Sequence, residues 1–476
     1  MTETEQDIEK TSGPGAEPEF SPDPETEEEG SYSLDRKTVA AILYAVDVGD
    51  REQLVELMEP LHAADIADVL EQVNAYDRRR LIELYGKEFD GEILSELDES
   101  IREEVISLLT PDVLMDAVRE LDSDDVVDLL EDLEQDQQDA ILGALEDSDR
   151  VAVQQALTFP EESAGRLMQR EVVAVPELWS VGQAIDFMRE REDLPEQFYH
   201  VILCDPRMKP VGHASLGKLM ASPRETALTD ITEPSFRTIP AMQDEGDVAY
   251  AFNQYHLISA PVVDEDERLV GVITIDDAMI VLDEEHEEDI LRLAGVGEGS
   301  LNDRVLDTLR QRLPWLAVNL VTAILASLVI SMFEGTIEQF VALAVLMPIV
   351  ASMGGNAGTQ SMTVAVRAIA TKDLTGSNVW RVILREGAVG MLNGGAFAVI
   401  MGVIATIWFG STLLGMVIAV AMIVNLFVAA IAGTIVPVML EKMKVDPALA
   451  SGTFVTTVTD VVGFFAFLGF AAMVLL

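Results

Sequence analysis

The segment that decides the fold is DPALASGTFVTTVTDVVGFFAFLGFAAMVLL, residues 446–476, an apolar stretch with a single carboxylate near its middle, Asp460. A charged residue at the centre of a membrane helix costs roughly 2.5–3.5 kcal/mol on insertion scales, and such residues usually mark a functional path. Thr453, Thr456 and Thr457 precede Asp460 at spacings that place them on the same helical face. Because Mg²⁺ takes oxygen ligands, this face predicts a cation path. The alternative is an aspartate satisfied by hydroxyls of a neighbouring helix.

The charge of the chain lies in its first two thirds. The 476 residues carry a net charge of −52, yet residues 312–476 contain seven basic and seven acidic side chains. The sequence therefore predicts a very acidic soluble part followed by a neutral membrane part. Such a surface excludes nucleic acid as a partner and attracts cations. Only eight of the 31 basic residues are lysine, which suggests a high-salt cytoplasm. Cys204 is the single cysteine, so no intramolecular disulfide can form.

Five apolar stretches are long enough to cross a hydrocarbon core of roughly 30 Å. Lysine and arginine precede the first stretch and lie in alternate loops, while the opposite loops carry none. By the positive-inside rule, this pattern predicts a multi-pass protein of the cell membrane with cytoplasmic N-terminal domains and an extracellular C-terminus. The expected spans are about 313–333, 337–365, 384–408, 412–440 and 447–476.

The soluble part divides by composition and period. Residues 1–33 are polar and acidic and predict a disordered tail. In residues 34–165, EPLHAADIADVLEQV (59–73) and LDSDDVVDLLEDL (121–133) repeat one pattern, which predicts stacked helical hairpins. Their acidic faces, with Asp124, Asp125 and Asp128, are either solvated surface or ion ligands.

Residues 166–283 alternate β-rich runs with helical segments, in two halves that contain KPVGHASLGKLM (209–220) and RLVGVITIDDAM (268–279). A charged connecting helix is then expected from about Asp283, with a glycine-rich break at 295–299. Its carboxylates share helix faces and repel one another, so they are either offset by bound cations or simply solvated. They are Glu284, Glu285, Glu288 and Asp289.

The second span contains MPIVASMGGNAGTQSMTVAVRA (347–368), in which Pro348 and three glycines disfavour a regular helix. Non-helical backbone at membrane depth is tolerated where it lines a cavity, so this stretch predicts part of a pore. The alternative is close helix packing through small residues. Asp446 before Pro447 is either a helix cap or a ligand at the cytoplasmic mouth. Asn425, Gly433 and Pro437 in the fourth span predict packing and a kink, and no nucleophile–base motif suggests an enzyme.

Several stretches together resemble the MgtE family of magnesium channels and transporters, over about residues 34–476. They are PEESAGRLM (160–168), two halves similar to CBS domains, the acidic connector, GGNAGTQ (354–360) and DPALASGTFVTTVTDVVG (446–463). The resemblance implies a multidomain fold. It comprises an all-α N domain built as a helical superhelix (34–165), α/β tandem CBS domains (166–283), a connecting plug helix (284–311) and an all-α membrane domain of five transmembrane helices (312–476).

The resemblance also implies a homodimer in membrane lipid, with Mg²⁺ both transported and regulatory, and it leaves ATP open as a ligand of the CBS domains. Gly452 and Thr456 depart from some relatives, which have Asn and Ala there. The implied pore residues are Asp460, Asp446, Thr456, Gly354, Gly355, Asn356, Gly358 and Gln360. The implied ligands of regulatory Mg²⁺ are Asp124, Asp128, Asp276, Asp277, Glu284, Glu285, Glu288 and Asp289.

Two other functions compete with a Mg²⁺-gated channel. One is an ion-coupled carrier of divalent cations. The other is a membrane-anchored sensor whose CBS pair binds adenine nucleotides. A sensor has no need of a carboxylate in the middle of the membrane, so Asp460 argues against the second alternative.

Overall fold

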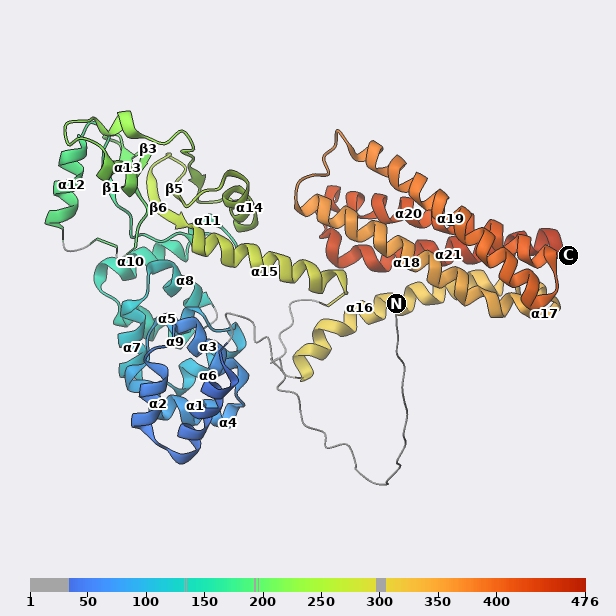
Figure 1. The fold of residues 1–476 in the computed structure, drawn as a ribbon, viewed down its shortest axis with the longest axis horizontal. Helices are drawn as coiled ribbons and strands as arrows, with labels where there is room; N and C mark the ends of the chain where they lie inside the picture. Colours follow the sequence, from blue (N-terminus) through green and yellow to red (C-terminus); the bar gives the residue numbers. More distant parts are fainter. Residues whose placement is uncertain (1–33, 132, 134, 192–193, 196, 297–304) are drawn as a thin grey trace, which may run out of the picture.

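The computed structural model describes residues 34–131, 133, 135–191, 194–195, 197–296 and 305–476. The predicted tail at 1–33 and most of the predicted glycine-rich break lie outside these residues. The described part has the expected class: a helical domain, two small α/β halves and a bundle of long helices (Figure 1).

The N domain is a stack of short helices with one continuous apolar core. Aspartate and asparagine side chains cap several of them, as Asn74 does by accepting hydrogen bonds from the amides of Tyr76 and Asp77. The helices are α1 (Arg36–Val48), α2 (Arg51–Met58), α3 (Ala63–Gln72), α4 (Ala75–Tyr85), η1 (Gly86–Glu88), α5 (Glu92–Ser95), α6 (Glu99–Leu108), α7 (Pro111–Glu120), α8 (Ser123–Glu131), α9 (Gln135–Ala144) and α10 (Asp147–Ala156).

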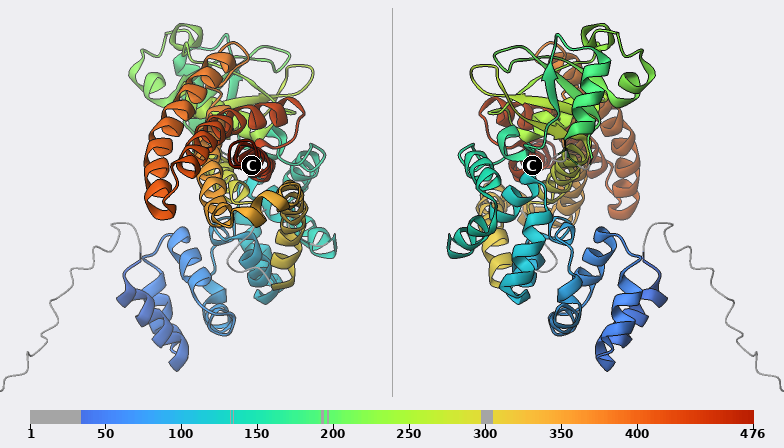
Figure 2. Two further views of the ribbon diagram at one scale, coloured as in Figure 1. Left: turned by 90° about the vertical axis from the view of Figure 1, so that its right-hand side faces the viewer. Right: turned by 90° about the vertical axis from the view of Figure 1, so that its left-hand side faces the viewer.

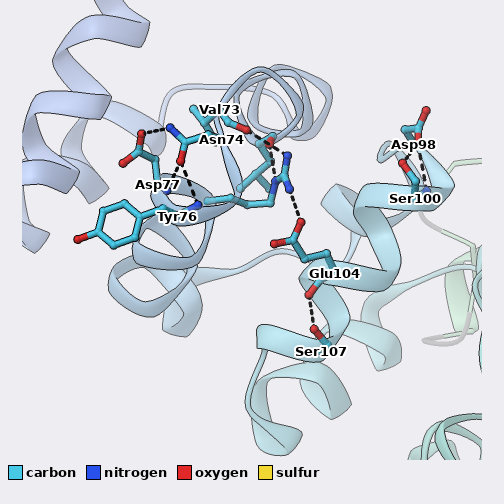
Figure 3. A network of polar contacts seen from close by, with 10 residues as sticks. Val73, Asn74, Tyr76, Asp77, Asp98, Ser100, Glu104 and Ser107 are labelled. Carbon is cyan, nitrogen blue, oxygen red and sulfur yellow. Dashed lines mark hydrogen bonds and ion pairs between the residues drawn. The ribbon is translucent and has the colours of Figure 1, made fainter. Parts of the chain in front are cut away.

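The repeat seen in the sequence is also a repeat of hydrogen bonds. Buried Arg78 donates from Nε to Leu70 O at 2.7 Å and from Nη2 to Val73 O at 3.1 Å. Sixty residues further on, Gln138 Nε2 donates to Leu130 O at 2.8 Å and to Leu133 O at 3.0 Å. Both side chains satisfy carbonyls left open at the end of the preceding helix. Figure 3 shows Val73 on one side of the first network and Glu104 of α6 on the other. The prediction of stacked hairpins is confirmed.

The CBS part contains two three-stranded sheets with the same topology. In each, the first strand pairs parallel with the second and the second antiparallel with the third. The β-rich runs predicted at 171–176, 199–205, 259–266 and 269–277 contain β1, β2, β5 and β6, while the two-residue strand β4 was not predicted. The elements are α11 (Ala164–Leu167), β1 (Ala174–Pro176), α12 (Val181–Glu190), β2 (His200–Cys204), β3 (Pro210–Ser215), α13 (Leu216–Ala221), η2 (Leu228–Ile231), β4 (Ile239–Pro240), α14 (Glu245–Tyr255), β5 (Ser259–Val263) and β6 (Leu269–Thr274).

The connecting helix begins earlier than predicted. Helix α15 (Ile275–Leu293) follows β6 directly, so the charged connector is the second half of the last CBS helix. Thr274 and Asp277 form a capping box that starts it, with Thr274 Oγ1 donating to Asp277 Oδ2 at 2.5 Å. The predicted start near Asp283 is wrong, because the helix continues across that position without a break. In Figure 1, α15 runs from the second sheet to the membrane bundle.

The membrane part consists of α16 (Val305–Ser331), a short α17 (Glu334–Gln339), α18 (Ala342–Ala370), α19 (Val379–Phe409), α20 (Thr412–Lys442) and α21 (Pro447–Leu475). Five of these are long and apolar enough to cross a membrane, as predicted. Helix α20 is the most buried of the five and packs against α18, α19 and α21. Seen along the bundle in Figure 2, α19 lies on its outer side.

The prediction of non-helical backbone in the second span is wrong. Helix α18 continues through Pro348 and the three glycines. A Cβ on Gly354 would lie 2.2 Å from Asn425 Nδ2, and one on Gly358 would lie 2.6 Å from Val455 Cγ1. These glycines are therefore sites of close helix packing, the alternative that the sequence had left open.

Candidate ion path and acidic cleft

The membrane carboxylate lies midway along α21. Asp460 is half-buried and follows Asp446 by 14 residues, which is about 21 Å along a helix axis. One turn before it, the Thr456 hydroxyl donates to Gly452 O at 2.9 Å, so its oxygen keeps lone pairs for a cation. Thr453 was predicted to share the helical face of Asp460, but it has a packing role. It is buried and donates to Asn319 Oδ1 of α16 at 2.9 Å, so it joins two helices.

The other predicted pore residues fall into two groups. Gly354 and Gly358 are buried between helices, as described above. Asn356 and Gln360, one turn apart, are both exposed in the single chain. Gly355 has open space where a side chain would be. The structure thus gives α18 one packed face and one open polar face.

A buried amide fixes the centre of the bundle. Asn425 of α20 is fully buried and donates from Nδ2 to Val350 O at 2.8 Å. Gly354 of α18 and Gly463 of α21 both leave the room that its side chain occupies. The predicted packing role of Asn425 is confirmed, and Gly463 was missed.

The third span carries a carboxylate that the sequence reasoning did not use. Glu386 lies seven residues into α19 and accepts a hydrogen bond from Ser361 Oγ of α18 at 3.1 Å. An acidic residue in an apolar span was the available signal.

The cytoplasmic end of α21 meets the end of α15. Asp446 caps α21 by accepting from the amide of Ala448 at 2.7 Å, and its second oxygen lies 3.4 Å from Arg292 Nη1. Arg292 also pairs with Glu288 at 2.6 Å. Leu293 packs on a small apolar cluster of α18 and α21 formed by Met362, Val366, Ala448 and Val455. The residue that serves as a helix cap therefore also faces the connector.

A cleft of about 690 Å³ lies between the N domain and α14, α15 and the segment before α11. It contains Asp124, Asp128, Asp277 and Glu284 of the predicted set. The sequence reasoning missed further acidic residues there, because acidic residues occur throughout this part of the chain. Asp125, which the sequence places on the same acidic helix face as Asp124, also lines the cleft, and the missed residues are Glu96, Asp98, Glu131, Glu161, Glu162 and Glu245.

The surroundings of this cleft disfavour negative charge. Desolvation, helped by the neighbouring carboxylates, raises the pKa of Asp125 to about 7 and that of Glu245 to about 7. Desolvation also raises the pKa of Asp124, whose Oδ1 has no hydrogen-bond partner among the described residues. A bound cation or a proton would therefore stabilise the closed cleft.

Four of the predicted ligands lie outside the cleft, and one that lines it is paired with an arginine. Asp128, although it lines the cleft, pairs with Arg102 at 2.5 Å. Asp276 is exposed and does not line the cleft. Glu285 lies against Gly246, where an added Cβ would be 2.5 Å from its Oε1. Glu288 and Asp289 lie near Arg292 at the end of α15. Desolvation raises the pKa of Asp289, and the negative charge of Asp446 raises it further. Helix α15 thus joins a cleft group of carboxylates to a group at the membrane.

The five membrane-length helices, with the attached helical N domain and the CBS pair, define a multidomain, multi-pass membrane protein. Residues 347–470 match a family model described as a divalent cation transporter, 61–162 match the MgtE intracellular N domain and 228–284 match a CBS domain. The chain belongs to the MgtE family of magnesium transporters.

Two curated relatives show how far the similarity extends. The magnesium transporter MgtE of Thermus thermophilus is 32% identical over 448 residues, covering 93% of this chain and 99% of the relative. That of Bacillus subtilis is 32% identical over 321 residues, covering 67% and 71%.

Two solved structures resemble the soluble part. The cytosolic domain of the Mg²⁺ channel MgtE in complex with ATP is 28% identical, covers 51% of this chain and 99% of that chain, and has a TM-score of 0.47. The soluble part of a magnesium transporter is 25% identical, covers 52% and 98%, and has a TM-score of 0.46.

Proposed function

We propose that this chain forms a Mg²⁺-selective channel that closes when Mg²⁺ binds to its acidic cytoplasmic part. The observation that supports this most directly is the course of α15. Its first turn supplies Asp277 to the cleft, its middle supplies Glu284, and its end contacts α21 through Arg292 and Asp446. A change in the cleft is therefore transmitted along one helix to the pore.

The gate works by coordination. Without a cation, the carboxylates of the cleft repel one another and the N domain separates from α15. Mg²⁺ favours the closed arrangement only as far as it binds that arrangement more tightly. In a salt-rich cytoplasm the Debye length falls to about 3 Å at 1 M salt, so directly bound ions, and not diffuse repulsion, control closing.

The permeation path runs beside Asp460. A single chain offers oxygen atoms on two helices, from Asp460 and Thr456 on α21 and from Asn356 and Gln360 on α18, and a second copy related by a two-fold axis would add the same set. The assembly is thus a homodimer with Asp446 at the mouth.

The soluble domains lie on the cytoplasmic side, with the C-terminus outside. Lys372, in the loop between α18 and α19, pairs with Asp247 of α14 and lies 4.5 Å from the ring centre of Tyr250. The basic loops and the CBS part thus share one end of the bundle, as the positive-inside rule requires.

Flux through purified protein in liposomes tests the proposal. Asp460→Ala should abolish Mg²⁺ flux. The triple variant Asp124→Asn, Asp277→Asn, Glu284→Gln should stay open at internal Mg²⁺ that closes the wild type. Asp283→Asn is the matched control, because it is exposed on α15 and does not line the cleft. A triple variant that closes like the wild type contradicts the gate, and flux through Asp460→Ala contradicts the path.

The carrier alternative is separated by single-channel recording, since a carrier gives no unitary currents. Nucleotide binding by the CBS domains stays a prediction. Equilibrium dialysis with ATP measures this directly.

A further inference from the structure

Two buried histidines and a glutamate meet inside the CBS pair, away from the acidic cleft. His200 lies on β2, His213 on the neighbouring strand β3, and Glu233 follows η2. The two imidazoles are stacked, with ring centres 4.3 Å apart and an angle of 22° between their planes. One ligand atom from each of the three side chains lies within 4.8 Å of the other two.

His213 is buried without the partners that a buried imidazole normally has. Its side chain is 3% exposed, and neither ring nitrogen has a hydrogen-bond partner among the described residues. The carboxylate oxygen Glu233 Oε2 lies 3.9 Å from its Nε2. Leaving such nitrogens unpaired is costly, so packing alone gives no reason for a histidine at this position.

A further contact fixes the orientation of one of the two rings. His200 Nδ1 lies 2.7 Å from Ser259 Oγ of β5. A hydrogen bond to one ring nitrogen orients the other for a metal.

We propose that His200, His213 and Glu233 form a site for a divalent transition-metal ion, with Zn²⁺ as the best fit. Two imidazole nitrogens and one carboxylate suit this class of ion, whereas Mg²⁺ takes oxygen ligands. The site is therefore chemically distinct from the carboxylates that bind the transported or regulatory ion. It lies between the two CBS halves, because His200 and His213 belong to the first sheet and Ser259 to the second.

Binding requires a small rearrangement. Bonds of 2.0–2.2 Å in a tetrahedral zinc site place ligand atoms roughly 3.3 Å apart, closer than the present 3.9 Å between His213 and Glu233. Stacked rings also point their lone pairs side by side, so one ring must turn until both face the ion. Glu233 is 23% exposed and provides the way in from solvent.

The test uses the full-length, untagged protein in detergent with excess Mg²⁺, which fills the oxygen sites. Co²⁺ serves as the probe, since its visible absorption reports nitrogen ligands and coordination number. The wild type should bind one Co²⁺ per chain with an intense visible band, and Zn²⁺ should displace it. His213→Phe should abolish the band, and Ser259→Ala should weaken binding by roughly 10- to 100-fold.

His256→Asn is the control, because His256 is an exposed histidine of the same domain with a φ of 52°, which asparagine tolerates. It should bind Co²⁺ like the wild type. Glu233→Gln removes a charged ligand at a partly exposed position, where a substitution is well tolerated. It therefore tests the metal site if His213→Phe does not fold. A wild type that binds no Co²⁺ in excess Mg²⁺ overturns the site, and so does unchanged binding in Glu233→Gln. The readout is independent of transport and of gating.

Discussion

At the scale of single residues, the bundle depends on contacts that leave no room for a methyl group. Gly354→Ala would place its new Cβ against the Asn425 amide and break the bond to Val350 O. We expect a loss of roughly 1–3 kcal/mol of unfolding free energy, measured by denaturant unfolding in detergent. Gly355→Ala is the control, because its Cβ would meet nothing within 4 Å. Equal stability of the two variants would contradict this packing role.

The two carboxylates in the spans should differ in function. Asp460→Asn keeps the side-chain shape and removes the charge, so preference for divalent over monovalent cations should fall while the protein still inserts. Glu386→Gln keeps an oxygen for the Ser361 hydroxyl and should leave that preference unchanged. Ion-replacement flux measurements on both variants check this. A loss of selectivity in Glu386→Gln alone would mean that the permeation path runs along α19.

A third residue-scale prediction concerns Arg78 in the N domain. It is 4% exposed and holds two carbonyls and the carboxylate of Glu104. Arg78→Leu leaves these groups unpaired and should cost about 3 kcal/mol, read as a lower unfolding midpoint. The exposed neighbour Arg79 gives the control, Arg79→Leu, which should change the midpoint little.

At the scale of elements, the cleft between α8, α14 and α15 should respond to pH. Asp125 and Glu245 have pKa values raised to about 7 by desolvation. Groups with raised pKa favour the closed cleft when protonated, so their contribution is full below about pH 4 and is lost as pH rises through about 7. Without Mg²⁺, the soluble part should therefore unfold more easily at about pH 8 than at about pH 6.

Mg²⁺ must displace those protons, so its stabilising effect on the unfolding temperature should be larger at the higher pH. Replacing Asp125 with Asn and Glu245 with Gln should flatten the pH dependence. If the Mg²⁺-free wild type is equally stable at both pH values, these carboxylates do not face each other in a closed cleft.

The sequence predicted elements better than it predicted contacts. Period and length were sufficient for the five spans and the β-rich runs, since burial imposes them locally. The glycines at 354–358 favoured a broken helix, because their partners Asn425 and Val455 lie far along the chain. Glu245 was missed for the same reason. Only the fold shows which carboxylates, among many, lose water together.

At the scale of the whole molecule, a second contact beside α15 joins the soluble and membrane parts. Lys372 pairs with Asp247 and lies over Tyr250. Both charged side chains are about half exposed, so the pair contributes no more than about 1 kcal/mol. Lys372→Gln should shift the internal Mg²⁺ needed for closing by about fivefold at most, less at high salt. A larger shift in flux assays would mean that this loop, and not α15, dominates the coupling.

Helix α15 also converts a small rotation at the cleft into a displacement at the membrane. From Asp277 to Leu293 it runs without a break, about 24 Å at 1.5 Å per residue. We therefore expect it to move as one rigid element whose far end contacts α21. A tilt of about 5° at the cleft would move the far end by about 2 Å over that length, comparable to the radius of a bare ion's first coordination shell. A small change in the angle of the cleft would thus move the membrane end of α15 far enough to block the passage of one ion.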